Sequence, residues 1–455
     1  MAELYAFLLY AMAAVVAVVV IAQGLSRSVE LFSARNIYLA GFIVYQLFSP
    51  AGVLMRDSTV KFQVKDIDAA GLIAVGYAAV FLVVYFLAYR FPGPWRGVAG
   101  WLKTKNTTAT DASLLIVGFT LVMLGLGMRL AQFIPYIRSI AFHTGVGLAA
   151  VSCVFVGWVV ARRYSNILVL VGSAVIFIAA VGLALDRSYG RRPLVGVCLG
   201  LMWGIYFSLG NRLKPKTLLL WLAPLSLAAL LIVSSFTAVR GRIGEMTFTQ
   251  VVQEMVSSKR TLEHAAAIFD GQLCGEATLW CIEAYPKKVD QQHILSLRQM
   301  VLQVIPRSIW PEKPEPLANQ LAKIANIDGV NHSRITLPPG VIGYAAAEGG
   351  LYALVLYAIF YGGFCRFFDL IVTENRDNPF MIAAASSVVG HMPGLARGDL
   401  ANLTNNAVVT FVAIYVTLWM VRKFVGKPVE QRMIYWQWIP APTPPTNVQG
   451  RAGGG

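Results

Sequence analysis

The sequence predicts an all-α integral membrane protein, a bundle of helices that crosses the bilayer about eleven times. Of its 455 residues, 57% are hydrophobic and only 13% are charged, whereas a soluble domain carries about a quarter charged residues. The mean hydropathy is +0.62. Runs of about 20 apolar residues, the length at which a helix crosses the hydrocarbon of a bilayer, recur along the chain. These observations exclude a soluble protein.

The apolar runs fall into two groups separated by a polar stretch, eight before it and three after it, with an error of one. They cover residues 4–24, 37–54, 69–89, 114–127, 145–161, 167–185, 194–209, 217–239, 341–372, 379–394 and 408–420. We therefore expect an N-terminal membrane bundle over residues 1–239, one large loop over 240–340 and C-terminal spans over 341–424. Residues 425–455 form a tail whose Pro- and Gly-rich end is expected to be disordered. The first run is full length and lacks a basic leader, so it is interpreted as a span.

The distribution of Lys and Arg predicts which side each loop faces. The first, third, fifth and seventh short loops hold 11 of these residues, and the second, fourth and sixth hold 8. Cytoplasmic loops retain the excess of positive charge. The C-terminal flank is also basic, with Arg422, Lys423, Lys427 and Arg432, and three spans separate it from the large loop. We therefore predict an extracytoplasmic large loop and a cytoplasmic C-terminus.

The net charge of +15 and the five cysteines raise two other classes of function, nucleic-acid binding and metal binding. The sequence supports neither of them. The basic residues lie in short loops, where they meet anionic lipid headgroups, and no basic stretch alternates with stacking aromatic residues, so no nucleic acid is expected as a partner. Cys274 and Cys281 lie seven apart in the large loop without a partner at zinc spacing, so no metal or other cofactor is predicted. They form either a disulfide or two unpaired thiols on one helix.

By these bounds, the first eight predicted spans contain no ionisable residue, which disfavours a transporter that relays charge through the bilayer. Ionisable groups occur instead at span ends and in loops. Guanidinium groups bind phosphate oxygens in pairs and stay charged, so external arginines are candidates for binding a lipid-linked pyrophosphate. The alternative is that they bind bulk phospholipid headgroups. The candidates are Arg191, Arg192, Arg240, Arg242, Arg334 and Arg397.

The most specific motif lies in the large loop, in the segment IPRSIWPEKPEP over residues 305–316. Its prolines fix an extended backbone from which Arg307 and Lys313 project, and Trp310 can lie against a sugar ring or the membrane interface. The order of proline, arginine, tryptophan, proline, lysine and proline resembles the signature of bacterial oligosaccharide repeat-unit polymerases of the Wzy type, which make O-antigen and exopolysaccharide.

Four further segments carry this resemblance, which is strongest over residues 240–400. They are GRRPLVG at 190–196, VRGRIGEM at 239–246, GVIGYAAAEGGLYALVL at 340–356 and LARGDL at 395–400. The last resembles the late turn of the polymerases and adds Asp399 to the candidate substrate-binding residues. The O-antigen ligases, which are related, carry a histidine about nine residues before the glutamate that corresponds to Glu348, whereas this chain has Pro339 or Gly340 there.

The resemblance implies a multi-pass glycosyltransferase of the bacterial inner membrane, with a helix bundle like that of the C-type lipid-dependent transferases. It would transfer a growing glycan from polyprenyl pyrophosphate to an incoming lipid-linked repeat unit, without a metal, and a chain-length regulator is a further partner of such enzymes. Arg307 and Lys313 would position the glycans, and His332 or Glu348 would activate the acceptor. The alternatives are a ligase that uses the same donor and a flippase of lipid-linked sugars.

Overall fold

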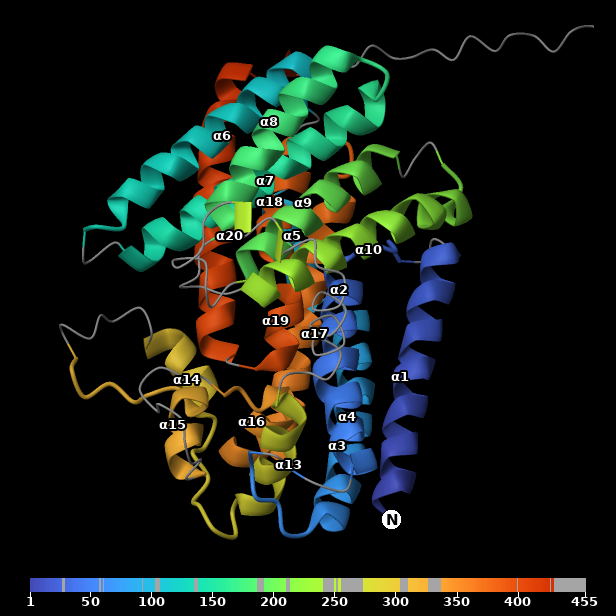
Figure 1. Ribbon diagram of the computed structural model, residues 1–455, viewed down its shortest axis with the longest axis vertical. Helices are drawn as coiled ribbons and strands as arrows, with labels where there is room; N and C mark the ends of the chain where they lie inside the picture. Colours follow the sequence, from blue (N-terminus) through green and yellow to red (C-terminus); the bar gives the residue numbers. More distant parts are fainter. Residues whose placement is uncertain are drawn as a thin grey trace, which may run out of the picture.

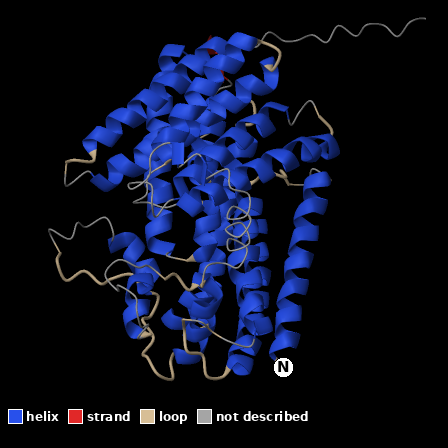
Figure 2. Ribbon diagram, viewed as in Figure 1, coloured by secondary structure: helices blue, strands red, loops and turns tan. Residues whose placement is uncertain are grey.

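A computed structural model describes most of the chain, and the described part is helical almost throughout (Figures 1 and 2). The described residues are 1–26, 29–56, 59, 61–91, 93–102, 107–134, 138–185, 192–209, 213–239, 249–250, 253–254, 273–302, 310–325, 337–398, 400–425 and 427–428. Among them, 11 helical segments are long and apolar enough to cross a membrane. The predicted fold class and number of spans are confirmed at this level.

The eight N-terminal spans are built from helices joined by short connections. These are α1 (Ala2–Leu25), α2 (Ala34–Phe42), the π-helix η1 (Ile43–Phe48), α3 (Ser49–Arg56), α4 (Ile67–Arg90), α5 (Gly93–Trp101), α6 (Asp111–Ala131), α7 (Arg138–Arg163), α8 (Ile167–Ala184), α9 (Arg192–Leu209) and α10 (Pro215–Val239). Several begin at a polar cap: the Asn166 side chain accepts hydrogen bonds from the first N–H groups of α8, and the Ser33 hydroxyl does so for α2.

The rest of the described chain forms the helices of the large loop and the last three spans. These are α13 (Cys274–Ala284), α14 (Leu295–Leu302), α15 (Leu317–Ile324), α16 (Gly340–Glu348), α17 (Leu351–Glu374), α18 (Pro379–Val389), α19 (Met392–Arg397) and α20 (Leu400–Val425). Two short strands, β1 (Thr107–Thr108) and β2 (Lys427–Pro428), pair in antiparallel fashion. Asn378 caps α18, and Pro379 supplies its first residue, a position that tolerates a missing N–H group.

The run predicted as one span over residues 341–372 is two helices. Gly349 and Gly350 have φ values of 153° and 64°, a backbone that interrupts the helix between α16 and α17. The ninth span is therefore α17 alone. The hydropathy of the sequence stays high across the break, which is why the apolar run alone did not reveal it.

Helices α7 and α9 pack closely through glycines spaced four residues apart on α9. A Cβ atom on Gly200 would lie 2.4 Å from the carbonyl oxygen of Ala150, and one on Gly204 would lie 2.1 Å from that of Val154. Gly157 of α7 approaches Leu201 in the same way, with a distance of 2.3 Å. Small residues at such spacing let the backbones of membrane helices meet, so these two helices form a tightly fixed pair.

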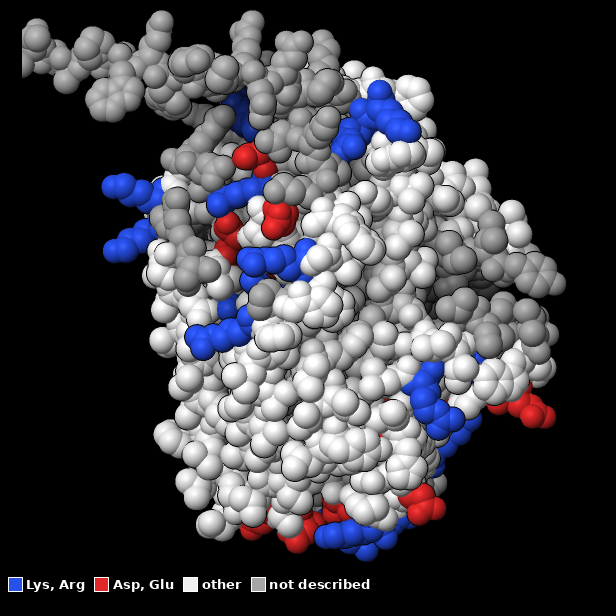
Figure 3. Space-filling model, turned by 180° about the vertical axis from the view of Figure 1, so that it is seen from behind, with Lys and Arg blue, Asp and Glu red and all other residues white. Residues whose placement is uncertain are grey.

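The two ends of the helical bundle differ in what they carry. We call the end that holds Met1, α13 and α16 the loop end (Figure 1). We call the end that holds β1 and β2 the tail end (Figure 2). The β1–β2 pair brings the segment before α6 beside the segment after α20, two segments that the charge count assigns to the same side. Between the two ends, the face shown in Figure 3 has an extended uncharged surface, as expected for contact with lipid.

The described part of the large loop packs against the bundle. Helix α13 lies against α3, α4 and α16, and a Cβ atom on Gly275 would lie 2.4 Å from the backbone of Ser49. Cys274 and Cys281 are both buried on α13 and form no disulfide. The structure therefore has the two unpaired thiols on one helix, the second of the two predicted alternatives.

The expectation that the first eight spans lack ionisable residues is wrong. Arg35 lies in the second span, which begins at Ala34, and His143 lies in the fifth, which begins at Ala141. Arg35 is 2% exposed. Both residues fall just before the apolar runs, because a hydropathy run stops at the first charged residue whereas the helix continues through it.

Candidate functional site

The structure describes five of the residues that the sequence singles out. These are Arg192, Trp310, Lys313, Glu348 and Arg397. The other predicted site residues lie outside the described part of the chain, namely Arg191, Arg240, Arg242, Arg307, His332, Arg334 and Asp399. Their roles stay predictions.

Arg192 lines a cavity of about 300 Å³ between α7, α9, α18 and α20. The polar groups on its wall come from His143, Arg192, Ser387, His391 and Asn406, and none of the described lining residues is acidic. Helices α7, α9 and α20 are the fifth, seventh and eleventh spans, so all three begin on the side on which α1 begins. The cavity lies at these beginnings, on the side that the charge count assigns to the outside of the cell.

His391 and His143 are the residues of this cavity that the sequence analysis missed. Their ring centroids are 6.4 Å apart, and the Nδ1 atom of His391 is buried without a hydrogen-bond partner. The chain has only five histidines, and each of these two stands at the edge of a predicted span. A histidine at the edge of a span is the sequence signal that could have identified them, since intramembrane ionisable groups are usually functional.

The short helix α19 connects the cavity to Arg397. His391 precedes α19 and Arg397 is its last residue. The Arg397 guanidinium lies 5.8 Å from the ring centroid of Tyr45, and its Nε atom is buried without a hydrogen-bond partner. Midway along α19, a Cβ atom on Gly394 would lie 3.7 Å from the Nε atom of Arg192. Two of the predicted phosphate-binding arginines are therefore close to one six-residue helix.

Gln46 of η1 fixes the end of α19 against the large loop. Its amide Nε2 donates to the carbonyl of Ala396 at 3.0 Å, and its Oε1 accepts from the N–H group of Ile342 at 3.1 Å. The same side chain occupies the space beside Gly340, where a Cβ atom would lie 1.8 Å from Nε2. Gly340, with φ of 72°, is thus required by both its backbone conformation and its neighbour.

Glu348, the predicted alternative base, is fully buried at the end of α16. Its carboxylate accepts hydrogen bonds from the N–H group of Ser296 at 2.8 Å, from the Ser296 hydroxyl at 2.6 Å and from the hydroxyl of Tyr357. Desolvation by burial raises the pKa of Glu348 above its ordinary value. Both oxygens are engaged, so the geometry favours a role in holding the start of α14.

Helix α14 in turn connects the proline-rich segment with α20. The Gln299 side chain donates to the carbonyl of Pro314 at 3.1 Å, which tethers the segment that holds Trp310 and Lys313. At the other side of α14, the Asn405 side chain donates to the carbonyl of Met300 at 2.9 Å. The next residue on α20, Asn406, lines the cavity. The cavity and the loop helices are thus adjacent.

The arrangement can bind an anion and hold a base near it. One guanidinium and two imidazoles face a cavity whose described wall has no carboxylate. The N–H groups of guanidinium and imidazole are donors to phosphate oxygens. Comparisons of the chain with family models, with curated proteins and with solved structures find no match.

Proposed function

We propose that this protein is a lipid-dependent glycosyltransferase that polymerises polyprenyl-pyrophosphate-linked oligosaccharides into a bacterial surface polysaccharide. The observation that carries the proposal is the cavity around Arg192, His143 and His391, which brings one guanidinium and two imidazoles together and lies on the side predicted to be external. Its volume of about 300 Å³ is at the lower end of the range for small-ligand pockets. The polymerase-like motif over residues 305–316 supports the same assignment from the sequence.

The proposed reaction is a displacement at the anomeric carbon of the donor glycan. The acceptor hydroxyl oxygen forms a bond to that carbon, the bond to the pyrophosphate oxygen breaks, and the pyrophosphate leaves with the bonding electrons. Arg192 stabilises the negative charge that develops on the leaving group, and Arg307 and Arg397 are further candidates for this role. The hydroxyl proton passes to a histidine, either His391, whose Nδ1 atom has no partner, or His332.

Trp310 and Lys313 are assigned to glycan positioning in this proposal. Trp310 is only half-buried, so part of its ring is free to lie against a sugar. Glu348 is assigned to positioning as well, because it anchors α14, and α14 holds the proline-rich segment. A ligase would use the same donor site, and the two reactions differ in the acceptor.

A flippase of lipid-linked sugars is the second candidate, and one observation favours it. Arg35 and His143 lie within spans, where charged groups mark pathways for ions or polar headgroups. A flippase would move the lipid-linked sugar across the bilayer without forming a glycosidic bond.

Reconstitution with lipid-linked repeat units distinguishes the candidates. The purified protein, supplied with these lipids and a chelator but without ATP or an ion gradient, is expected to produce a ladder of longer glycans. Strict dependence on a divalent metal would contradict the arginine-based mechanism. Transbilayer movement without a new bond would identify a flippase, and transfer only to a different acceptor would identify a ligase. His391→Gln should reduce the ladder while the protein stays folded.

A further inference from the structure

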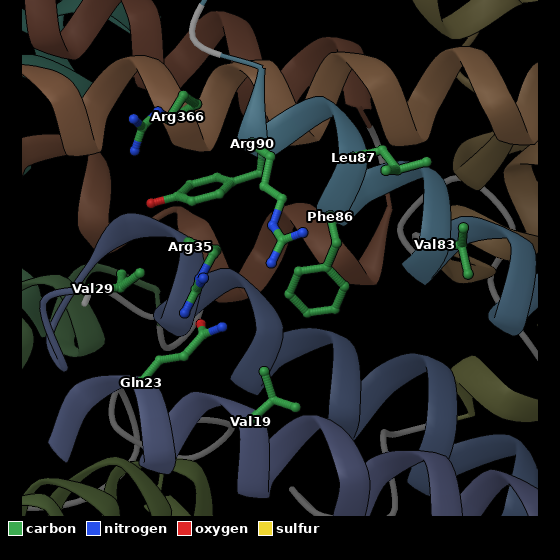
Figure 4. A pocket seen from close by; sticks show the side chains of 10 residues that line it. Val19, Gln23, Val29, Arg35, Val83, Phe86, Leu87, Arg90 and Arg366 are labelled. Carbon is green, nitrogen blue, oxygen red and sulfur yellow. The ribbon is translucent and has the colours of Figure 1, made fainter. Parts of the chain in front are cut away.

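A second and larger cavity lies between α1, α2, α4 and α17. Its volume is about 750 Å³, and we call it the tail-end groove (Figure 4). It is lined by Val19, Gln23, Val29, Arg35, Val83, Phe86, Leu87, Tyr89, Arg90 and Arg366. It lies where the first and third spans end and the second begins, the side opposite to the start of α1.

Three guanidinium groups from three helices line this groove. Figure 4 shows Arg35, Arg90 and Arg366 on its wall, with Arg366 set apart from the other two. The Cζ atoms of Arg35 and Arg366 lie 5.1 Å and 5.3 Å from the ring centroid of Tyr89. Arg366 precedes the last residue of α17 by eight positions, about 12 Å along the helix axis, and its guanidinium lies beside Tyr89, one residue before the end of α4.

These three charges form no ion pair within the described part of the chain. No carboxylate oxygen described there lies within 4.0 Å of their guanidinium nitrogens. The nearby carboxylate of Asp369 is engaged elsewhere, since it accepts from the N–H groups of Ala34 and Arg35 and from the Tyr89 hydroxyl. The Nε atom of Arg366 is buried without a hydrogen-bond partner. Charges in or at the edge of a membrane span are costly unless paired, and Asp369, whose charge acts on Arg35, can offset at most one of the three.

Apart from Gln23 and Tyr89, the rest of the lining is apolar. Val83 is 60% exposed and Leu87 is 61% exposed, and both are on α4 beside α1. A free phosphate ion would leave this wall without a contact. A phospholipid would fill the groove completely, with its phosphodiester at the arginines and an acyl chain along Val83, Phe86 and Leu87.

We propose that the tail-end groove is a binding site for one anionic glycerophospholipid, with the headgroup phosphate held by Arg35, Arg90 and Arg366. Guanidinium groups suit this ligand because they bind phosphate oxygens in pairs. The site shares no lining residue with the cavity around Arg192, and the proposal does not depend on the function proposed for that cavity.

Native mass spectrometry of the full chain in mild detergent tests the proposal. The probes are dioleoyl phosphatidylglycerol and dioleoyl phosphatidylcholine, which share their acyl chains and differ in headgroup charge. The wild-type protein is expected to retain one phosphatidylglycerol with an affinity about tenfold higher than for phosphatidylcholine. Arg366→Gln should lower the affinity for phosphatidylglycerol about five- to tenfold, the loss of one charge contact. Equal retention of the two lipids would overturn the proposal.

A matched control variant and two competitors complete the test. Arg422→Gln removes the same charge from α20, also toward the tail end but away from the groove, and should leave the affinity unchanged. Arg90→Gln, at an exposed position, repeats the test if Arg366→Gln does not fold. Displacement of the lipid by millimolar inorganic phosphate would identify a free-anion site and overturn the lipid assignment. Tighter binding of polyprenyl phosphate than of phosphatidylglycerol would also overturn it.

Discussion

The carboxylate of Glu348 accepts two hydrogen bonds from Ser296, a residue 52 positions earlier in the chain. One comes from the backbone N–H group and the other from the hydroxyl, so the glutamate satisfies a donor at the start of α14 that has no partner inside its own helix. The Tyr357 hydroxyl, on α17, donates to the same carboxylate. Three helices are therefore joined at one buried side chain between the large loop and the last spans.

This arrangement predicts a pH-dependent stability. Burial raises the pKa of Glu348, so the folded protein binds the proton more tightly than the unfolded chain does. The contribution of this group is fully present below the pKa of the unfolded chain and is lost as the pH rises through the pKa of the folded state. The thermal unfolding midpoint should therefore fall as the pH rises above about 4, the ordinary pKa of a glutamate. Glu348→Gln should flatten this slope, and an unchanged slope would contradict the assignment.

Glu348→Ala should also destabilise the protein. The three donors around Glu348 require acceptors, and alanine offers none. The expected loss is about 1–3 kcal/mol in the free energy of unfolding. Ser296→Ala removes one donor without leaving another unpaired and should cost less. If Glu348 instead served only as the base, activity would fall without a change in unfolding.

The glycines between α7 and α9 predict a second effect on stability. Gly204→Ala would place a Cβ atom 2.1 Å from the carbonyl oxygen of Val154, so the helices have to separate. Overpacking of this kind costs about 1–3 kcal/mol. Gly172→Ala is the matched control, because it adds the same methyl group on α8 with nothing within 4 Å. Thermal unfolding in detergent should separate the two variants, and equal midpoints would refute the close packing.

Arg192 is predicted to support catalysis by stabilising the negative charge that develops on the leaving pyrophosphate. Arg192→Ala should lower the rate of glycan extension about a hundredfold in the reconstituted assay, and Arg192→Lys should rescue poorly because an ammonium cannot bind two oxygens side by side. Arg163→Ala is the control, since Arg163 lies at the other end of α7 in an exposed ion pair with Asp111. Normal extension by Arg192→Ala would remove Arg192 from the mechanism.

The orientation of the chain can be tested by labelling introduced cysteines. The five native cysteines are buried, so Lys287→Cys, after α13, and Ser165→Cys, between α7 and α8, provide the accessible thiols. An impermeant maleimide should label Lys287→Cys in intact cells and Ser165→Cys only after the membrane is opened. The reverse pattern would invert the predicted topology and place the cavity around Arg192 in the cytoplasm.

The number of spans was predictable because apolar length is a local property of the sequence. The break at Gly349 and Gly350 was visible as a glycine pair, but hydropathy averages over it. The bonds between Asp369 and the start of α2 join residues more than 300 positions apart, and no periodicity reports such a contact. For the same reason, the span-edge positions of His143 and His391 did not reveal that the two histidines lie beside Arg192.

The large loop was predicted as an external cap, and its described helices are more deeply packed than that. Helix α13 is buried on nearly all sides, with Leu279 and Cys281 fully buried, and it packs against α3 and α4. The polar residues on both sides of α13 lowered the average hydropathy of the region and concealed this. Composition over about a hundred residues cannot resolve one buried helix of 11 residues.

Asn405 and Asn406, neighbours on α20, contact two different parts of the molecule, since one bonds to α14 and the other lines the cavity. A ligand that occupies the cavity and shifts the start of α20 must therefore change how firmly α14 is docked. Thermodynamic reciprocity then requires that docking of α14 change the affinity for that ligand by the same factor. The loop helices would thus act as an effector of the cavity, and the size of the coupling is measurable as the change in ligand affinity caused by Asn405→Ala.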